Sequence, residues 1–127
     1  MDVLVSAPVF PSEDAEKVMH AVKNIFPTAT LERSEDGVNG TADLEYFSKR
    51  IRQQKILDAA RSVMRKGRRS GRTVFRLNKQ AAFAGKISFA EERTVLGTIT
   101  VTVEDEDIDS VIDTVAPVTV DGMEVRT

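Results

Sequence analysis

The stretch Thr98-Ile99-Thr100-Val101-Thr102-Val103 alternates strictly between threonine and branched apolar residues. Because successive side chains of a strand point to opposite faces, the isoleucine and the valines share one face and the threonines the other. One apolar face and one hydroxyl face are typical of an antiparallel sheet that is covered on one side and open to water on the other. This stretch therefore predicts a half-covered antiparallel sheet.

The flanking sequence supplies short strands and amphipathic helices. Residues 3–9 alternate in the same way, and residues 28–33 and 38–42 read as a hairpin. A one-face apolar stripe predicts a helix that Ser12 caps and Pro27 stops, and a second stripe predicts a helix over residues 108–115. Residues 73–77 predict another strand, followed by a short helix over residues 79–84.

Residues 43–66 resemble one long helix, but their periodicity indicates two. Leu44, Phe47 and Ile51 lie within about 60° of one another on a helical wheel, whereas the apolar residues from Ile56 to Met64 cluster on the opposite side. A straight helix cannot turn both sets to one core. We expect helices over about 43–51 and 54–66 with a bend near residues 52–53; the alternative is one helix buried on different faces at its two ends.

The fold class follows from the character of the strands. Most are short and half-polar, and they interleave with helices. This pattern favours the α+β class, with a largely antiparallel sheet and helices packed on one face, over a buried parallel sheet. The length of 127 residues predicts a single domain over 1–127, with a tail or an edge strand from about residue 118.

Composition excludes several kinds of chemistry. The chain has no cysteine, so disulfides, thiolate catalysis and cysteine-based zinc sites are excluded, and its one histidine cannot build a multi-histidine metal site. Neither a signal peptide nor a membrane-spanning apolar run is recognisable, which predicts a cytoplasmic protein with no membrane partner. Because no catalytic or phosphate-loop motif occurs, we expect no cofactor, no metal and no enzymatic activity.

Charge is distributed very unevenly along the chain. Residues 49–86 hold thirteen of the 18 Lys and Arg residues and one acid, Asp58, so this stretch carries +12. The remaining residues carry −14, which gives the net charge of −2. A basic surface on an acidic body attracts polyanions.

The basic stretch contains the first candidate site, a helix row that continues into a glycine-flanked loop expected to be flexible. Such a row can follow the phosphates of structured RNA. Aromatic residues are not interleaved with it, which argues against base stacking on single strands. The alternative is a solvated helix face that happens to be basic. The predicted nucleic-acid-binding residues are Lys55, Arg61, Arg65, Lys66, Arg68, Arg69 and Arg72.

Two smaller candidates lie outside that row. Arg76, Asn78 and Lys79 surround the start of a short helix, where free backbone N–H groups can bind an anion; the alternative is that Asn78 simply caps the helix. The acidic run at residues 104–109 lacks the spacing of a calcium loop and is better explained as acids at a helix start. This run could also dock the basic surface of a second copy, which would give a homodimer.

Several segments occur together in one archaeal family. In chain order they are Ala7-Pro8-Val9-Phe10-Pro11-Ser12-Glu13-Asp14, Asn24-Ile25-Phe26-Pro27, Arg52-Gln53-Gln54-Lys55-Ile56-Leu57-Asp58-Ala59-Ala60-Arg61 and Leu77-Asn78-Lys79-Gln80-Ala81-Ala82. On this ordered set the chain resembles the uncharacterised protein family 0201, from Val3 to about Asp121. Arg61, Asn78 and Lys79 fall within the shared segments, whereas the arginines of the loop do not.

The resemblance implies a fold like that of the large-subunit ribosomal protein that binds 5S RNA. It also implies RNA as a partner and a link to a P-loop kinase-like protein, but no catalytic activity. Fold likeness alone does not establish function. The leading hypothesis is therefore a non-enzymatic RNA-binding module that grips phosphates; the alternative is a protein–protein interaction or accessory module for a kinase-like partner.

Overall fold

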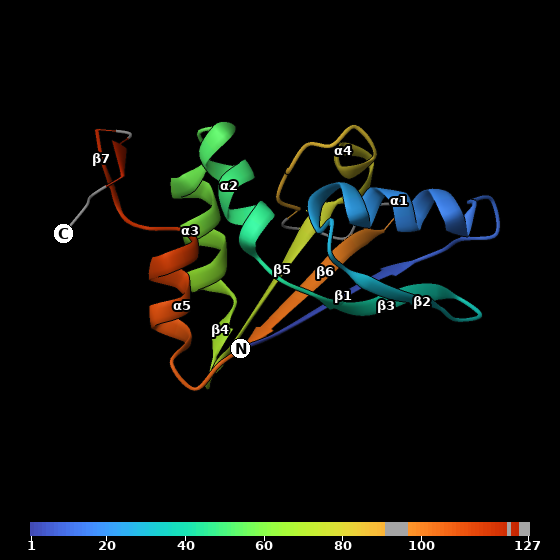
Figure 1. Cartoon of the computed structure of the whole chain (residues 1–127), viewed down its shortest axis with the longest axis horizontal. Coiled ribbons are helices and arrows are strands. Elements are labelled where there is room, and N and C mark those ends of the chain that lie inside the picture. The colour runs from blue at the N-terminus through green and yellow to red at the C-terminus, as the bar shows by residue number, and fades with distance from the viewer. Residues whose placement is uncertain (91–96, 122, 125–127) are drawn as a thin grey trace.

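The computed structural model of the chain describes residues 1–90, 97–121, 123 and 124. Six strands form one antiparallel sheet in the order β2-β3-β1-β6-β5-β4 (Figure 1). The strands are β1 Asp2–Pro8, β2 Thr30–Arg33, β3 Gly37–Ala42, β4 Arg68–Arg69, β5 Arg72–Asn78 and β6 Thr98–Glu104. The helices are α1 Ala15–Ile25, α2 Glu45–Gln53, α3 Leu57–Lys66, α4 Lys79–Phe83 and α5 Ile108–Val115. The predicted α+β class is confirmed.

Strand β6, which contains the alternating stretch, lies in the middle of the sheet between β1 and β5. Val101 is opposite Val5 on one side and Phe75 on the other. Ile99, Val101 and Val103 are fully buried, whereas Thr100 and Thr102 lie half-exposed on the other face. The helices cover the apolar face, so the half-covered sheet predicted from the alternation is confirmed (Figure 1).

An aromatic cluster fills the space between the helices and the sheet. Phe47 of α2 stacks on Phe26, with ring centroids 5.9 Å apart, and contacts Phe75 of β5 at 5.5 Å. Phe89 packs edge-on against both Phe47 and Phe75. Offset and edge-to-face packing of this kind suits the charge distribution of aromatic rings. The cluster therefore holds α2 against the central strands.

The break between α2 and α3 is confirmed: α2 ends at Gln53 and α3 begins at Leu57. Lys55 adopts the left-handed conformation at φ 59°, and the Ile56 N–H donates to the carbonyl of Ile51 at 3.0 Å. The chain thereby reverses direction, so Ile51 of α2 and Met64 of α3 are both fully buried in the same core. The change in apolar phase along the sequence reflects this reversal.

Three local predictions were wrong in detail. Asp14, not Ser12, caps α1, since its carboxylate accepts a hydrogen bond from the Glu16 N–H at 2.9 Å. The glycine-flanked loop contains β4, which pairs with β5 in a tight hairpin. The expected tail or edge strand instead forms a separate two-stranded sheet of β7 Thr119–Val120 and β8 Met123–Glu124.

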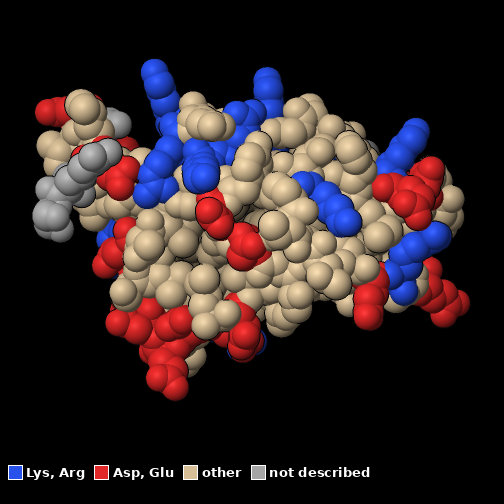
Figure 2. Space-filling view, in the orientation of Figure 1, with Lys and Arg blue, Asp and Glu red and all other residues tan. Residues whose placement is uncertain are grey.

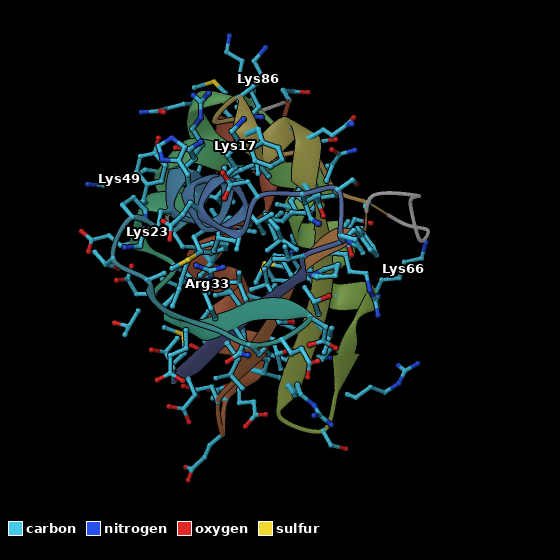
Figure 3. The ribbon with its side chains drawn as sticks, turned by 90° about the vertical axis from the view of Figure 1, so that its right-hand side faces the viewer. Lys17, Lys23, Arg33, Lys49, Lys66 and Lys86 are labelled. Carbon is cyan, nitrogen blue, oxygen red and sulfur yellow. The ribbon has the colours of Figure 1, made fainter. Side chains whose placement is uncertain are left out.

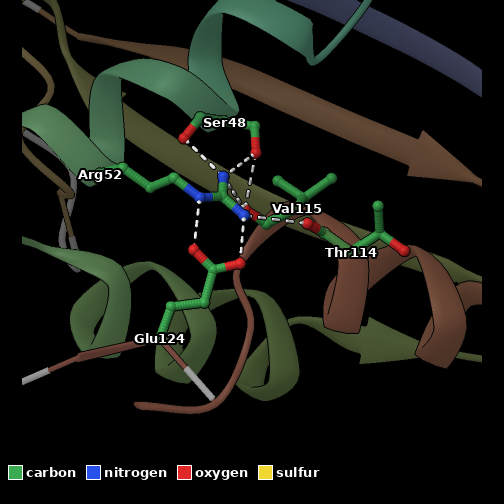
Figure 4. A network of polar contacts seen from close by, with 5 residues as sticks. All are labelled: Ser48, Arg52, Thr114, Val115 and Glu124. Atoms are coloured by element: carbon green, nitrogen blue, oxygen red, sulfur yellow. Dashed lines mark hydrogen bonds and ion pairs between the residues drawn. The ribbon is translucent and has the colours of Figure 1, made fainter. Parts of the chain in front are cut away.

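Arg52 at the end of α2 holds that small sheet in place (Figure 4). Its guanidinium binds both carboxylate oxygens of Glu124, at 3.1 and 3.3 Å, and donates to the carbonyls of Ser48, Thr114 and Val115. A planar guanidinium suits this use because it presents several donors in fixed directions. Arg52 therefore joins α2, the end of α5 and β8.

Candidate nucleic-acid interface

The predicted binding residues do not form one continuous surface. Arg61 projects from α3 toward α5, where its Nη1 donates to Asp113 Oδ1 at 2.7 Å and to the carbonyl of Ala116 at 3.2 Å. Only 16% of its side chain is exposed. Its charge is neutralised locally, so Arg61 joins two helices and presents little positive charge to a ligand.

The β4–β5 hairpin lies beside the acidic run. Arg68 forms an ion pair with Asp109, and the Asp105 N–H donates to the carbonyl of Gly71 at the hairpin tip, at 3.0 Å. Arg72 is opposite Glu104 in the β5–β6 register. The backbone N–H of Asp107 donates to the Asp105 carboxylate and lowers its pKa, which favours the charged form.

We call this part of the molecule the hairpin end. Its exposed basic residues are Arg65, Lys66, Arg68, Arg69 and Arg72, of which Arg68 forms the ion pair with Asp109. An open hollow next to the hairpin tip is lined by Gly71, the first two residues of the chain and residues 104–106. Three neighbouring carboxylates and Asp2 therefore oppose the positive charge of the hairpin end.

Lys79, predicted at an anion site, is buried. Its ammonium donates to the carbonyl of Pro8 at 2.7 Å and to Glu13 Oε1 at 3.0 Å, and it lies 5.1 Å from the centre of the Phe10 ring. Only 1% of the lysine side chain is exposed. The charge therefore serves the contact between α4 and the β1–α1 turn and is not available at the surface.

The other two members of that predicted site are separated from Lys79. The Asn78 side chain accepts a hydrogen bond from the Ala81 N–H at 3.0 Å, as the capping alternative expected. Arg76 alternates with the buried Phe75 and Leu77, so it lies exposed on the open face of the sheet. The structure thus gives the three residues three different environments.

A second group of basic residues gathers on the helices. The chain reaches this surface from α1, α2, the α2–α3 turn and the end of α4, which are distant in sequence. We call it the helix-layer patch; its members are Lys17, Lys23, Lys49, Arg50, Lys55 and Lys86. Within the described part of the chain, none of the five lysines has an acidic partner within 4 Å.

Backbone anchors bring these segments together. Arg50 Nε donates to the carbonyl of Gly85 at 3.3 Å, which places α2 beside the end of α4. The Gln54 amide binds both the N–H and the carbonyl of Ile87, at 2.8 and 2.9 Å. Lys55 and Lys86 directly adjoin this pair in the chain, so two segments about thirty residues apart bring their lysines to the same part of the molecule.

Two views of the side chains separate the two basic groups (Figures 2 and 3). Figure 2 shows basic side chains over the upper, helix-covered part of the molecule and acidic side chains at its lower-left end, where α5 begins. Lys17, Lys23, Lys49 and Lys86 lie in the upper and left part of Figure 3, whereas Lys66 extends to the right. A ligand on the helix-layer patch would thus lie away from Lys66.

The open face of the sheet carries a different kind of hollow. Its volume is about 520 Å³, and its lining comes largely from threonine, serine and asparagine, with Glu32 as the charged member.

The described residues contain no group of three potential metal ligands. No helix within the same residues is both long and apolar enough to cross a membrane.

Comparison with known families assigns the chain to a class. A family model described as RNA binding matches residues 2–104, and the chain belongs to this RNA-binding family. More particularly, it is a UPF0201 protein, as the resemblance predicted. It is 41% identical to the UPF0201 protein of Methanopyrus kandleri over 94% of this chain and 87% of that relative. It is 39% identical to a UPF0200/UPF0201 protein of Archaeoglobus fulgidus, of which it spans 40%.

Solved structures agree with this assignment. The crystal structure of the UPF0201 protein from Methanococcus jannaschii has a TM-score of 0.90 and 37% identity, and covers 99% of this chain and 100% of that chain. A further Archaeoglobus fulgidus structure has a TM-score of 0.66 at 20% identity, which shows a shared fold alone. The two comparisons support the α+β architecture independently of the surface charges.

The segments that revealed the family supply mostly internal anchors. Lys79 from the last segment binds Pro8 and Glu13 from the first. Asn24 donates to the carbonyls of Ala82 and Phe83, at 2.9 and 3.3 Å. Arg61 and Gln54 similarly bind backbone carbonyls elsewhere in the fold. The residues of these segments therefore stabilise the fold, whereas most of the helix-layer patch lies outside the segments.

Proposed function

We propose that the protein binds RNA through phosphate contacts made by the helix-layer patch, without catalysing a reaction. One observation carries the proposal: six basic side chains from separate segments share a surface on which the five lysines have no acidic partner among the described residues. Cations with no protein partner remain available to phosphates. The family model described as RNA binding supports RNA as the polyanion.

The hairpin end makes a smaller contribution in this proposal. Arg65, Lys66, Arg69 and Arg72 are exposed and can reach phosphates, as can Arg76 on the open face of the sheet. The carboxylates of residues 104–106 and Asp109 lie near the hairpin and repel an RNA backbone. We therefore infer that the helix-layer patch makes the larger contribution to RNA binding.

Binding to structured RNA across a salt series tests the proposal. Six phosphate contacts predict a loss of about 10³ in affinity between 50 and 200 mM salt. The variant K49E/K55E/K86E should bind about 100-fold more weakly at intermediate salt, and its salt slope should be smaller by about 3. Binding that is weak, insensitive to salt and unchanged in the variant would overturn the proposal.

A protein partner is the second candidate. The observation that favours it is the Archaeoglobus fulgidus relative named UPF0200/UPF0201, of which the present chain matches only 40% of the length. On this reading the helix-layer patch would contact a kinase-like partner or the acidic run of a second copy. Light scattering at low and high salt separates the candidates, since a salt-sensitive assembly without RNA affinity would favour a protein partner.

A cytoplasmic location of the protein remains a prediction.

A further inference from the structure

Two aromatic side chains are exposed within the helix-layer patch. Phe83 at the end of α4 is 39% exposed and Tyr46 in the first turn of α2 is 37% exposed. The chain contains seven aromatic residues, and the other five are buried or half-buried. The two exposed aromatic residues therefore lie on α2 and α4, the helices that also contribute to the helix-layer patch.

Hydrogen bonds fix the backbone beneath these rings. The carbonyl of Phe83 accepts from Asn24 Nδ2 of α1, and two residues later the carbonyl of Gly85 accepts from Arg50 Nε of α2. Tyr46 lies one helical turn before Arg50, and residues four apart share a helix face. Both rings thus border the junction of α1, α2 and α4.

The fold interleaves aromatic and basic groups that are separate in the sequence. Lys49 and Arg50 follow Tyr46 on α2, and Lys86 follows Phe83 after α4. The sequence predicted no base stacking, because no aromatic residues interleave with the basic row over residues 55–72. Tertiary contacts create that interleaving on a different surface. Basic side chains beside exposed rings are the chemistry that binds unpaired nucleotides, since bases stack on the rings while cations contact phosphates.

We infer that the helix-layer patch binds unpaired nucleotides of RNA, with Phe83 and Tyr46 as stacking surfaces. The inference rests on the proposed function and narrows its substrate to single-stranded segments such as loops. Stacking contributes about 1–3 kcal/mol per base, so loss of one ring costs about tenfold in affinity. A blunt duplex offers no unpaired bases to these rings and should be unaffected by their removal.

Tyr46 provides a direct probe because it is the only tyrosine in a chain without tryptophan. Its fluorescence should be quenched by an unstructured oligouridylate and not by a blunt RNA duplex at equal occupancy. Free N-acetyltyrosinamide in parallel corrects for absorption by the RNA. Phe83→Leu should weaken oligouridylate binding about tenfold and change duplex binding less than about twofold. The matched control is Leu4→Ala, which alters an exposed apolar residue on the opposite face of the sheet.

The outcomes separate this inference from the proposed function. If the wild-type protein binds neither RNA, the proposed function fails. If it binds both RNAs, loses both in K49E/K55E/K86E, and shows no preferential quenching and no effect of Phe83→Leu, RNA binding stands and the stacking inference is overturned. Thermal unfolding of Phe83→Leu and Tyr46→Phe verifies folding, and Tyr46→Phe should retain affinity because its ring remains.

Discussion

The helix-layer patch and the hairpin end carry similar numbers of exposed cations but differ in what surrounds them. Lysines of the patch come from separate segments and have no acidic partners among the described residues. At the hairpin end Arg68 pairs with Asp109, and Arg72 lies opposite Glu104. Carboxylates of the acidic run therefore oppose part of the positive charge in the second region, whereas among the described residues no ion pair engages the lysines of the first. The number of cations in a stretch of sequence does not measure the field at a surface.

A third environment, the buried cation, gives the largest expected effect. Lys79→Met removes the ammonium that binds Glu13 and Pro8, which leaves the mostly buried Glu13 carboxylate without its ion-pair partner. We expect a loss of about 3 kcal/mol in the free energy of unfolding, measured by urea denaturation, with RNA affinity unchanged under folding conditions. Lys49→Met is the control at an exposed site and should leave stability unchanged. Weaker RNA binding by a fully stable Lys79→Met would assign this lysine to the ligand surface.

Charge reversal at the hairpin end tests the comparison directly. R65E/K66E/R69E changes the net charge as much as K49E/K55E/K86E does, but it removes cations from the end of the molecule where Arg68 pairs with Asp109 and Arg72 lies opposite Glu104. We expect about a fivefold loss of RNA affinity, against about 100-fold for the patch variant, at the same salt concentration. Equal losses would mean that RNA spans both regions. A larger loss at the hairpin end would reverse their order.

Neutralising the acidic run should make the contributions of the two regions to RNA affinity more similar. E104Q/E106Q/D109N removes three negative charges beside the hairpin, so we expect RNA affinity to rise about threefold and the salt slope to steepen. The matched control E32Q/E35Q/D36N makes the same change in net charge on β2 and the β2–β3 turn. If both variants gain equally, overall charge and not the local balance governs binding.

The smallest effect concerns two carboxylates, Asp43 just before α2 and Asp105 at the hairpin end. The Thr28 hydroxyl and the Glu45 backbone N–H donate to Asp43 and lower its pKa, and the Asp107 N–H lowers that of Asp105. A lowered pKa stabilises the folded state above the ordinary aspartate pKa of about 3.9, and this contribution is lost as pH falls toward the folded-state value.

Asp43→Asn should therefore cost at most about 1 kcal/mol at pH 7, because the side chain is exposed, and less near pH 3. Urea denaturation at both pH values measures the difference. Asp105→Asn should show the same sign at the hairpin end. A penalty that grows as the pH falls would contradict the assigned direction of the pKa.

Prediction from sequence succeeded where the signal was local. Alternation over residues 98–103 placed the central strand, and the phase change after Ile51 located the break between α2 and α3. The Ser12 cap failed because Asp14 makes the competing local hydrogen bond, and Glu13 beside it turns inward to Lys79. The direction in which Glu13 turns depends on a partner 66 residues away, which periodicity cannot reveal.

The candidate surface was harder to predict than the fold. Lys55 was identified as a candidate, and it lies in the helix-layer patch; Lys17 and Lys23 were not, because each is an isolated cation on α1, and Lys86 lies at the end of the basic stretch, beyond the predicted row. An exposed lysine on a polar helix face was the signal available, and it does not distinguish a binding residue from an ordinary solvated one. The hydrogen bonds of Arg50 and Gln54 to Gly85 and Ile87 bring α2 beside the end of α4, and the sequence does not show this proximity.

By itself the sequence determined the half-covered sheet, the helix break and the uneven charge, since each follows from side-chain order within one or two elements. Only the tertiary structure decided which cations stay available. It folded the arginine hairpin against the acidic run, buried Lys79, and gathered scattered lysines beside Tyr46 and Phe83. The physical reason is that strand and helix patterns depend on neighbours in the chain, whereas charge pairing depends on neighbours in space.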